Sequence, residues 1–397
     1  MLVAITPAIR QGPGYDAAVR TLVYVDSVYR QADGAVYGEL SFTSFIASLA
    51  DEMQVTIIGR LDYGEGPARY RIPDGVQFIA LPHYESLDNL RAALSPLLSS
   101  LRCFWESAGN ADVAWLFGPY LLSQLFAILA LVRRRRVVLG VRQDFPTYVR
   151  RRRPSKRWMH LSADILERGW RAWARRLPTV VVGPQLAAHY QHSRSLLPIA
   201  VSLIHREDIV DEGRAPQHDY DGELQVLSVG RLDEEKNPLL LAEALALLRR
   251  DDPRWRMIIC GDGPLRGQLI ERLGELGVRD AAELRGHVPL REGLLELYRS
   301  SHIFLHVSRT EGFPQVLIEA FASGVPVVAT AVGGVPAEVG SAAVLVEPEN
   351  APAVAEAVNR VAGDPNLRSQ LVSAGFAKAH EHTLELEIKQ VAAFLRG

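Results

Sequence analysis

The sequence predicts an α/β protein with two doubly wound domains, and three observations carry this prediction. The chain has 397 residues, and chains beyond about 250–300 residues usually split into domains. Short apolar segments alternate with longer amphipathic ones in both halves, which is typical of parallel sheets covered by helices. A polar segment punctuated by Gly213 and Pro216 separates the halves, as expected of a linker.

The N-terminal half reads as repeated strand and helix units. Such alternation predicts a parallel sheet whose ligand-binding loops lie at the carboxyl ends of its strands. A glycine-containing loop follows the first expected strand. We expect strands at 22–29, 55–59, 76–81, 113–117, 137–141 and 179–182, and helices at 40–52 and 120–132.

One uncharged stretch allows two interpretations. Val113–Val132 has no charged residue and is followed by Arg133–Arg136, which is typical of a membrane span with a positive flank. Gly118 and Pro119 interrupt it, however, and buried parallel strands also give continuous apolar runs. We therefore favour a strand, a turn and a helix over a membrane span.

The C-terminal half repeats the alternation after the polar segment. Its strands are expected at 224–229, 256–260, 281–285, 303–307 and 325–330, and its helices at 238–250, 264–276, 291–299 and 314–323. We place an N-terminal domain at 1–205, a linker at 206–223, a second domain at 224–376 and a terminal helix at 377–397.

Charge and cysteine content limit the classes of function. The net charge of −2 gives no overall attraction to nucleic acid, and two cysteines argue against a disulfide framework or a structural zinc site. The total hides a basic block, because residues 133–176 hold 15 Arg or Lys against 3 Asp or Glu. The amino terminus lacks the pattern of a secretory signal, so we expect a cytoplasmic protein.

The basic block also contains Trp158, Trp170 and Trp173. Basic amphipathic helices with tryptophan can lie on anionic membrane surfaces. The alternative is a solvated basic face above ordinary core tryptophans. The block is therefore a candidate contact with the inner face of a membrane or with an anionic acceptor.

The segment Ser308–Gly334 is the most informative part of the chain. Pro314 suits the first turn of a helix, and Gly324 with Pro326 ends it. Glu311 then lies in the preceding loop and Glu319 within the helix. A helix N-terminus offers backbone N–H groups to a phosphate, so an anionic ligand could bind beside this start.

The spacing of these glutamates resembles the E-x7-E signature of retaining glycosyltransferases of family 4. Further matches are LSVGRLDEEKNPLLLAEAL at 227–245, IICGDGPLRGQL at 258–269, LRGHVP at 284–289 and GGVP at 333–336. The resemblance implies the GT-B fold, with two Rossmann-like domains facing across a cleft and a C-terminal helix that crosses back to the N-terminal domain. It implies transfer of a sugar from a nucleotide diphosphate sugar, with no metal or cofactor.

The resemblance assigns roles to four side chains. Arg231 and Lys236 would stabilise the diphosphate as it leaves, Glu319 would accept hydrogen bonds from the ribose, and Glu311 would contact the transferred sugar. Neither glutamate is an obvious nucleophile, because retaining hydrolases need two carboxylates close to the anomeric carbon. We therefore favour front-face retention assisted by the leaving phosphate.

Other residues are expected around the donor. Pro314 stands where many relatives have glycine, which removes one backbone donor from the phosphate cradle. The base and the sugar stay unidentified, because backbone contacts to a base leave little trace in side chains. The remaining donor candidates are Gly230, Ser308, Gly312, Phe313, Pro314 and Gln315, with Gly261, Gly286, His287 and Val288 in the turns beside the nucleotide.

The N-terminal half departs from the family pattern. Arg142 stands where relatives commonly have histidine, and an arginine that stays charged would bind phosphate or an anionic acceptor rather than act as a base. Asp144 is then the nearest candidate base, unless a salt bridge to a neighbouring arginine engages it. The loop Gly34–Gly38, with Gly34, Ala35, Tyr37 and Gly38, would approach the diphosphate and acceptor, and Gly12–Gly14 is a rival for that role.

Two other functions compete with sugar transfer. A nucleotide-sugar epimerase would keep the donor site and need no acceptor. The other alternative is a non-catalytic carbohydrate-binding or membrane-binding protein, and the intact Arg231, Lys236, Glu311 and Glu319 argue against it. Asp219 and Asp221 match the D-x-D of metal-dependent transferases, but they lie in the linker, far in sequence from the donor motifs. The acceptor, the linkage and the oligomeric state are not readable from the sequence.

Overall fold

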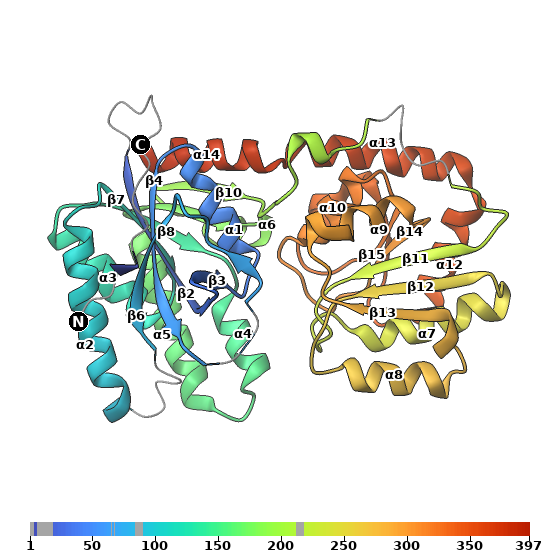
Figure 1. The fold of residues 1–397 in the computed structure, drawn as a ribbon, viewed down its shortest axis with the longest axis horizontal. Coiled ribbons are helices and arrows are strands. Elements are labelled where there is room, and N and C mark those ends of the chain that lie inside the picture. Colours follow the sequence, from blue (N-terminus) through green and yellow to red (C-terminus); the bar gives the residue numbers. More distant parts are fainter. Residues whose placement is uncertain (1–3, 6–18, 65, 67, 84–89, 212–217) are drawn as a thin grey trace. The chain divides into compact units, whose positions relative to one another are not determined.

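The computed structural model describes residues 4–5, 19–64, 66, 68–83, 90–211 and 218–397, without the side chains of 4–5, 90–93 and 151. Contacts divide the chain into two compact units, which Figure 1 draws in ribbon form. Unit 1 comprises residues 1–203 and 386–397, and unit 2 comprises residues 204–385.

Unit 1 contains a largely parallel sheet with the strand order β1-β6-β4-β2-β7-β8-β9-β10. The parallel strands run in sequence outward from β2 to β6, return to β7 and continue to β10, so the order reverses between β2 and β7. The strands are β1 (Ala4–Ile5), β2 (Arg20–Ala32), β3 (Ala35–Gly38), β4 (Gln54–Asp62), β5 (Tyr70–Arg71), β6 (Gln77–Pro82), β7 (Val113–Gly118), β8 (Arg136–Val141), β9 (Pro178–Val182) and β10 (Ser195–Ile199).

Helices cover both faces of this sheet. On one face, Phe104 and Phe126 stack with their ring centroids 4.1 Å apart, and Trp170 is fully buried beside them. On the other face, Phe42 packs edge-on against Phe117. The helices are α1 (Phe42–Ala47), continued by a 3-10 turn at Ser48–Asp51, α2 (Leu90–Ala108), α3 (Leu121–Val132), α4 (Phe145–Arg152), α5 (Arg157–Ala174) and α6 (Pro184–His189).

The strand–turn–helix interpretation of 113–132 is confirmed. Val113–Gly118 forms β7, which is buried along its whole length, and α3 follows a turn at Pro119 and Tyr120. Across the described ranges, no helix combines the length and the apolar character that a membrane crossing requires.

The prediction of a loop at Gly34–Gly38 is wrong, because most of this segment forms a strand. Asp33 and Gly34 form a tight turn with φ values of 49° and 76°, and Ala35–Gly38 is strand β3, paired antiparallel with β2. An Asp-Gly pair between two alternating segments favours such a hairpin, because both turn residues need positive φ. The rival segment Gly12–Gly14 lies outside the described residues.

Unit 2 has a six-stranded parallel sheet in the order β13-β12-β11-β14-β15-β16. The chain starts at the centre with β11, moves outward to β13 and returns to β14, so a topological switch point lies between β11 and β14. The strands are β11 (Leu224–Val229), β12 (Trp255–Cys260), β13 (Ala282–Gly286), β14 (Ile303–His306), β15 (Val327–Thr330) and β16 (Ala343–Val346).

Two apolar layers cover the faces of the second sheet. Helices α7 (Pro238–Asp251), α8 (Arg266–Glu275) and α12 (Ala351–Gly363) pack on one face. Helices α9 (Leu295–Ser300), α10 (Gln315–Ala322), α11 (Val335–Val339) and the end of α13 (Pro365–Glu381) pack on the other.

The expected linker and terminal helix differ from the structure in detail. The described part of 206–223 is fastened to unit 2, because Asp208 pairs with Arg291 at 2.8 Å and Tyr220 donates to the carbonyl of His302 at 3.0 Å. The expected helix 377–397 is interrupted, since α13 ends at Glu381 and α14 spans Leu384–Arg396.

Helix α14 returns to unit 1, as the resemblance implies. Arg396 donates to the carbonyl of Glu52, and Arg136 donates to the carbonyl of Phe394 at 3.1 Å. Val391 and Leu395 are fully buried. Unit 1 is therefore completed by the last residues of the chain.

Candidate donor site at the switch point of unit 2

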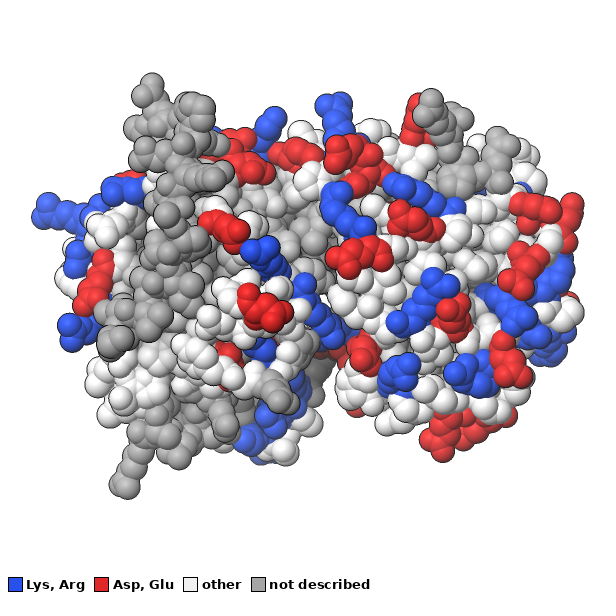
Figure 2. Space-filling view, in the orientation of Figure 1, with Lys and Arg blue, Asp and Glu red and all other residues white. Residues whose placement is uncertain are grey.

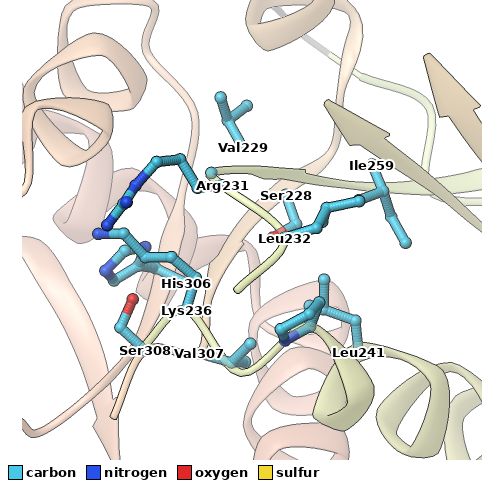
Figure 3. A pocket seen from close by; sticks show the side chains of 12 residues that line it. Ser228, Val229, Arg231, Leu232, Lys236, Leu241, Ile259, His306, Val307 and Ser308 are labelled. Carbon is cyan, nitrogen blue, oxygen red and sulfur yellow. The ribbon is translucent and has the colours of Figure 1, made fainter. Parts of the chain in front are cut away.

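A small pocket lies at the carboxyl ends of β11 and β14, where the strand order of unit 2 reverses. In open α/β sheets, ligands bind at such a switch point. Figure 3 shows the side chains of Arg231 and Lys236 converging beside His306, with the Ser308 hydroxyl directed toward the same space. The pocket is lined by Ser228, Val229, Gly230, Arg231, Leu232, Lys236, Pro238, Leu241, Ile259, His306, Val307 and Ser308.

Two glycines allow the loops around this pocket to approach one another. A Cβ on Gly261, whose φ is +145°, would lie 1.8 Å from the carbonyl oxygen of Gly230. A Cβ on Gly333, whose φ is +57°, would lie 1.9 Å from the carbonyl oxygen of Glu311. Gly334 also donates its N–H to that carbonyl at 3.2 Å. The GGVP motif thus holds the backbone of Glu311.

Glu311 is buried, and its carboxylate contacts a lysine and a histidine. The Lys236 ammonium donates to Oε1 of Glu311, and Nε2 of His306 lies 2.9 Å from the same oxygen. Only 8% of the Glu311 side chain is exposed. Burial opposes its ionisation, but the charge of Lys236 and the contact with His306 outweigh burial and hold the pKa of Glu311 well below its ordinary value. The carboxylate is therefore ionised and held in place.

Glu319 lies in a different environment, on α10. Its Oε2 accepts a hydrogen bond of 2.9 Å from the hydroxyl of Tyr298 on α9, and the residue is 8% exposed. Burial raises the pKa of Glu319 to about 7, and the Tyr298 hydrogen bond only partly offsets this effect. The pKa values of the two glutamates of the signature are thus shifted in opposite directions.

Arg231 is more exposed than Lys236. Its guanidinium lies 3.0 Å from Asp233 and 3.3 Å from Glu235, both in its own loop, and 54% of its side chain is accessible. The Lys236 side chain is 23% exposed. An anionic ligand would compete with Asp233 and Glu235 for Arg231, and with Glu311 alone for Lys236, which lines the pocket.

His306 and Ser308 are both buried at the end of β14. Among the described residues, no hydrogen-bond partner reaches the Oγ of Ser308, although Thr330 fixes its backbone by donating to the Ser308 carbonyl at 2.7 Å. A buried hydroxyl without a partner in a pocket is a candidate ligand contact. Sequence reasoning missed His306, although its place at the end of a strand beside the switch point was a usable signal.

The remaining donor candidates are in other loops of unit 2 and do not line this pocket. Helix α10 begins at Gln315, and Pro314 is its N-cap in an extended conformation rather than part of its first turn. Proline has no side-chain acceptor, so the cap residue does not cover the first-turn N–H groups. Phe313 packs edge-on against His382. The turn after β12 is tied to β13, because Gly261 donates to the carbonyl of Gly286 at 2.7 Å, and His287 and Val288 follow that strand.

The candidates in unit 1 lie at the carboxyl end of its own sheet. The Arg142 guanidinium, just after β8, lies 5.4 Å from the ring centroid of Phe42. Burial raises the pKa of Tyr120 to about 12, an effect that the Arg142 charge opposes. Ala35, Tyr37 and Gly38 lie in strand β3.

Asp144 has a structural partner that the sequence did not suggest. It is the N-cap of α4, and its carboxylate accepts hydrogen bonds from the N–H of Thr147 at 3.1 Å and from its hydroxyl at 2.8 Å. An acid at this position stabilises the helix start. Its assignment as a base stays a prediction.

The aspartates of the D-x-D match belong to a turn. Asp219 accepts from the N–H of Asp221 at 2.8 Å, and Arg254 donates to the carbonyls of Tyr220, Asp221 and Gly222. Within the ranges that the structure describes, no three His, Cys, Asp or Glu side chains are grouped so that they could hold a metal ion.

Comparison with known proteins shows what the second unit resembles. Residues 210–378 match the family model described as glycosyl transferases group 1. An exopolysaccharide phosphotransferase of Streptomyces coelicolor is 38% identical over 175 residues, which are 43% of this chain and 18% of that protein. A D-inositol 3-phosphate glycosyltransferase of Corynebacterium urealyticum is 33% identical over 178 residues, which are 43% of this chain and 42% of that protein.

The chain thus spans less than half the length of the curated relatives that it matches. Solved structures cover more of it. Anabaena HepE in complex with UDP and glucose superimposes with a TM-score of 0.67 and 16% sequence identity, covering 96% of this chain and 100% of that one. This likeness shows the GT-B fold for both units. In sequence, residues 210–378 of this chain are similar to the glycosyl transferases group 1.

Proposed function

We propose that the protein is a retaining, metal-independent glycosyltransferase that moves a sugar from a nucleotide diphosphate sugar to a hydroxyl acceptor in glycoconjugate or polysaccharide synthesis. The observation that carries the proposal is the contact of Lys236 and His306 with the buried Glu311 at the switch point of unit 2. HepE, which shares the fold, is solved with UDP and glucose, and this supports a nucleotide-sugar donor.

The donor would bind with its diphosphate beside Lys236 and Arg231. When the bond between the anomeric carbon and the phosphate oxygen breaks, negative charge grows on that oxygen, and positioned cations stabilise it. Ser308 Oγ, buried without a partner in the described residues, would donate to a phosphate oxygen. Glu319 would accept a hydrogen bond from a ribose hydroxyl, and Glu311 would contact a hydroxyl of the transferred sugar.

Retention would follow from attack on the face that the diphosphate leaves. The acceptor oxygen bonds to the anomeric carbon, and its proton passes to the departing phosphate oxygen. Glu311 is held by Lys236, and Glu319 is bonded to Tyr298, so neither is arranged as a nucleophile. Asp144 caps α4, which favours the leaving phosphate over Asp144 as the proton acceptor.

The acceptor is proposed to be anionic or lipid-linked. Arg142 would bind its phosphate or carboxylate at the carboxyl end of the unit 1 sheet, beside Phe42, which closely follows the β2–β3 hairpin. Such an acceptor is met at the inner face of a membrane, where we place the protein. The basic region 133–176 would then provide peripheral attachment.

Incubation with single nucleotide sugars tests the proposal. We expect slow hydrolysis of one donor in the absence of acceptor, with release of the nucleoside diphosphate and of a sugar whose initial anomeric configuration, read by NMR, is that of the donor. An inverted initial product would refute retention. Conversion of the donor into an epimeric nucleotide sugar would instead identify an epimerase.

A further inference from the structure

Exposed apolar side chains gather on one layer of helices in unit 1. Helices α2, α3 and α5 pack on the same face of the sheet, over a shared core, and Gln124 of α3 donates to the carbonyl of Leu166 on α5 at 2.8 Å. Of the 12 large apolar side chains that are exposed in the described chain, nine belong to these helices. They are Leu94, Leu98, Trp105, Leu121, Ile128, Val132, Trp158, Leu161 and Ile165.

The outer face of α5 is the sharpest case. Its buried residues include Ala163, Glu167 and Trp170, which point to the core. Leu161 and Ile165 are 59% and 55% exposed and, at 3.6 residues per turn, lie on the opposite side of the helix. A helix that faces water usually carries polar residues on its outer side. The apolar residues on the outer side of α5 therefore indicate a binding surface.

The basic residues around this face separate into two groups. Arg133, Arg135 and Arg136 serve the fold, because Arg133 stacks 4.0 Å over the ring of Trp105 and the other two donate to backbone carbonyls. The second group, in and beside α4 and α5, is exposed. It comprises Arg152, Arg153, Arg157, Arg168, Arg175 and Arg176.

Acidic side chains near α5 are already neutralised or buried. Asp164 accepts two hydrogen bonds of 2.7 Å from Arg150, and Glu167 accepts one of 2.7 Å from Tyr190 in the interior. The Arg157 and Arg168 side chains flank the apolar row on its outer face. Figure 2 shows blue side chains gathered at the lower edge of unit 1, where Figure 1 places α4 and the adjacent end of α5.

We infer that the outer face of the α2–α3–α5 layer docks on an anionic lipid surface, with Trp158, Leu161 and Ile165 inserted between headgroups and the flanking arginines on lipid phosphates. Charge complementarity selects this occupant, because apolar residues framed by exposed arginines match a negatively charged interface. The inference deepens the proposed membrane attachment, and it requires nothing of the transfer chemistry.

Vesicle sedimentation of the full chain tests the docking surface. The wild type is expected to sediment with phosphatidylglycerol-containing vesicles at low salt, less at high salt, and not with phosphatidylcholine alone. The variant Trp158→Gln/Leu161→Gln/Ile165→Gln should lose about tenfold or more in vesicle affinity, because three apolar side chains no longer leave water. The variant Arg157→Gln/Arg168→Gln should lose binding mainly at low salt.

Matched controls keep the test specific. The variant Tyr63→Gln/Leu386→Gln removes exposed apolar side chains outside the layer, and Arg250→Gln removes an exposed cation of unit 2. Both should bind vesicles like the wild type. Equal melting temperature and equal donor hydrolysis in all variants exclude misfolding and separate this test from that of the transfer reaction.

Three results would overturn the inference. The first is that the wild type does not bind anionic vesicles at low salt, and the second is that the triple variant binds them as well as the wild type. The third is that the wild type self-associates without binding vesicles and that the triple variant abolishes this self-association. The last result would make the same face an interface between copies of the chain.

Discussion

Lys236 is the residue on which the charge balance of the donor site depends most. It contacts Glu311 and is directed into the pocket, whereas Arg231 is shared with Asp233 and Glu235. Lys236→Met should therefore lower kcat by about a hundredfold or more, because one preorganised cation at the leaving group is lost. Steady-state kinetics with the active donor measure this effect.

The control for that variant is Lys378→Met, which removes a surface lysine paired with Glu381 at 2.9 Å. Its kcat should be unchanged. A Lys236→Met enzyme that turns over at the wild-type rate would exclude Lys236 from leaving-group stabilisation.

Glu319 should make the stability of the ligand-free protein depend on pH. Its pKa is raised from 4.5 to about 7 by burial. Burial of the neutral Glu319 side chain costs the folded protein less free energy than burial of the charged form. The free energy of unfolding is therefore highest below the pKa of Glu319 in the unfolded chain, and it falls as the pH rises through the folded pKa. The loss approaches about 3 kcal/mol. Thermal melts of wild type and Glu319→Gln between about pH 4.5 and 7.5 should show a larger decline for the wild type.

Parallel declines in the two proteins would show that Glu319 titrates as it does in the unfolded chain. Glu296→Gln is a suitable control, because Glu296 lies in the first turn of α9 and is exposed. Its pH profile should follow that of the wild type.

At the scale of the elements, the tight contact between the GGVP turn and the Glu311 loop should be sensitive to a single methyl group. Gly333→Ala places a Cβ 1.9 Å from the Glu311 carbonyl oxygen in addition to straining a positive φ, which by itself costs about 1–3 kcal/mol. We expect lower stability and a loss of kcat from the displaced Glu311. Denaturant unfolding and kinetics of the same variant measure both.

Gly340→Ala separates the two effects. Gly340 has a similar φ of +53°, but a Cβ there meets nothing within 4 Å. Gly340→Ala should lose stability from backbone strain alone and keep kcat. Equal kinetic losses in both variants would argue against a specific role of the Gly333 contact.

The sequence predicted the elements of unit 2 well because its buried strands are continuous apolar runs bounded by glycine and proline. Expected strands such as 224–229 and 256–260 agree with β11 and β12 within one residue. The edge strands β1 and β5 carry two residues each, too few for a periodic pattern. In the sequence, the Asp33-Gly34 pair is equally compatible with the start of a loop, whereas in the structure it joins the two strands of the β2–β3 hairpin.

The residues of the donor site that stand in a linear motif could be predicted from the sequence. The contacts that depend on packing between distant segments could not. Arg231, Lys236, Glu311 and Glu319 stand in recognisable segments, although their roles remain predictions. The contact of His306 with Glu311 arises from the neighbouring ends of β14 and the following loop, and no linear spacing reveals it. Likewise, the capping role of Asp144 required the position of Thr147.

For the whole molecule, the last helix should be essential to unit 1 rather than to the donor site. Leu395 of α14 is fully buried and is counted with unit 1. Leu395→Ala should therefore destabilise unit 1 by about 2–5 kcal/mol, whereas Lys389→Ala, on the exposed side of the same helix, should change stability little. Calorimetric unfolding with and without nucleotide would show the ligand-stabilised transition of unit 2 unchanged in both variants.

The donor site in unit 2 is the central claim, and equilibrium binding tests it most directly. Titration calorimetry of the wild type, Lys236→Met and Glu311→Gln against uridine, guanosine, adenosine and thymidine diphosphate sugars would give each affinity. We predict that one of these donors binds the wild type and that both variants bind it at least about tenfold more weakly. Absence of binding by every donor, or equal affinity in all three proteins, would contradict the account.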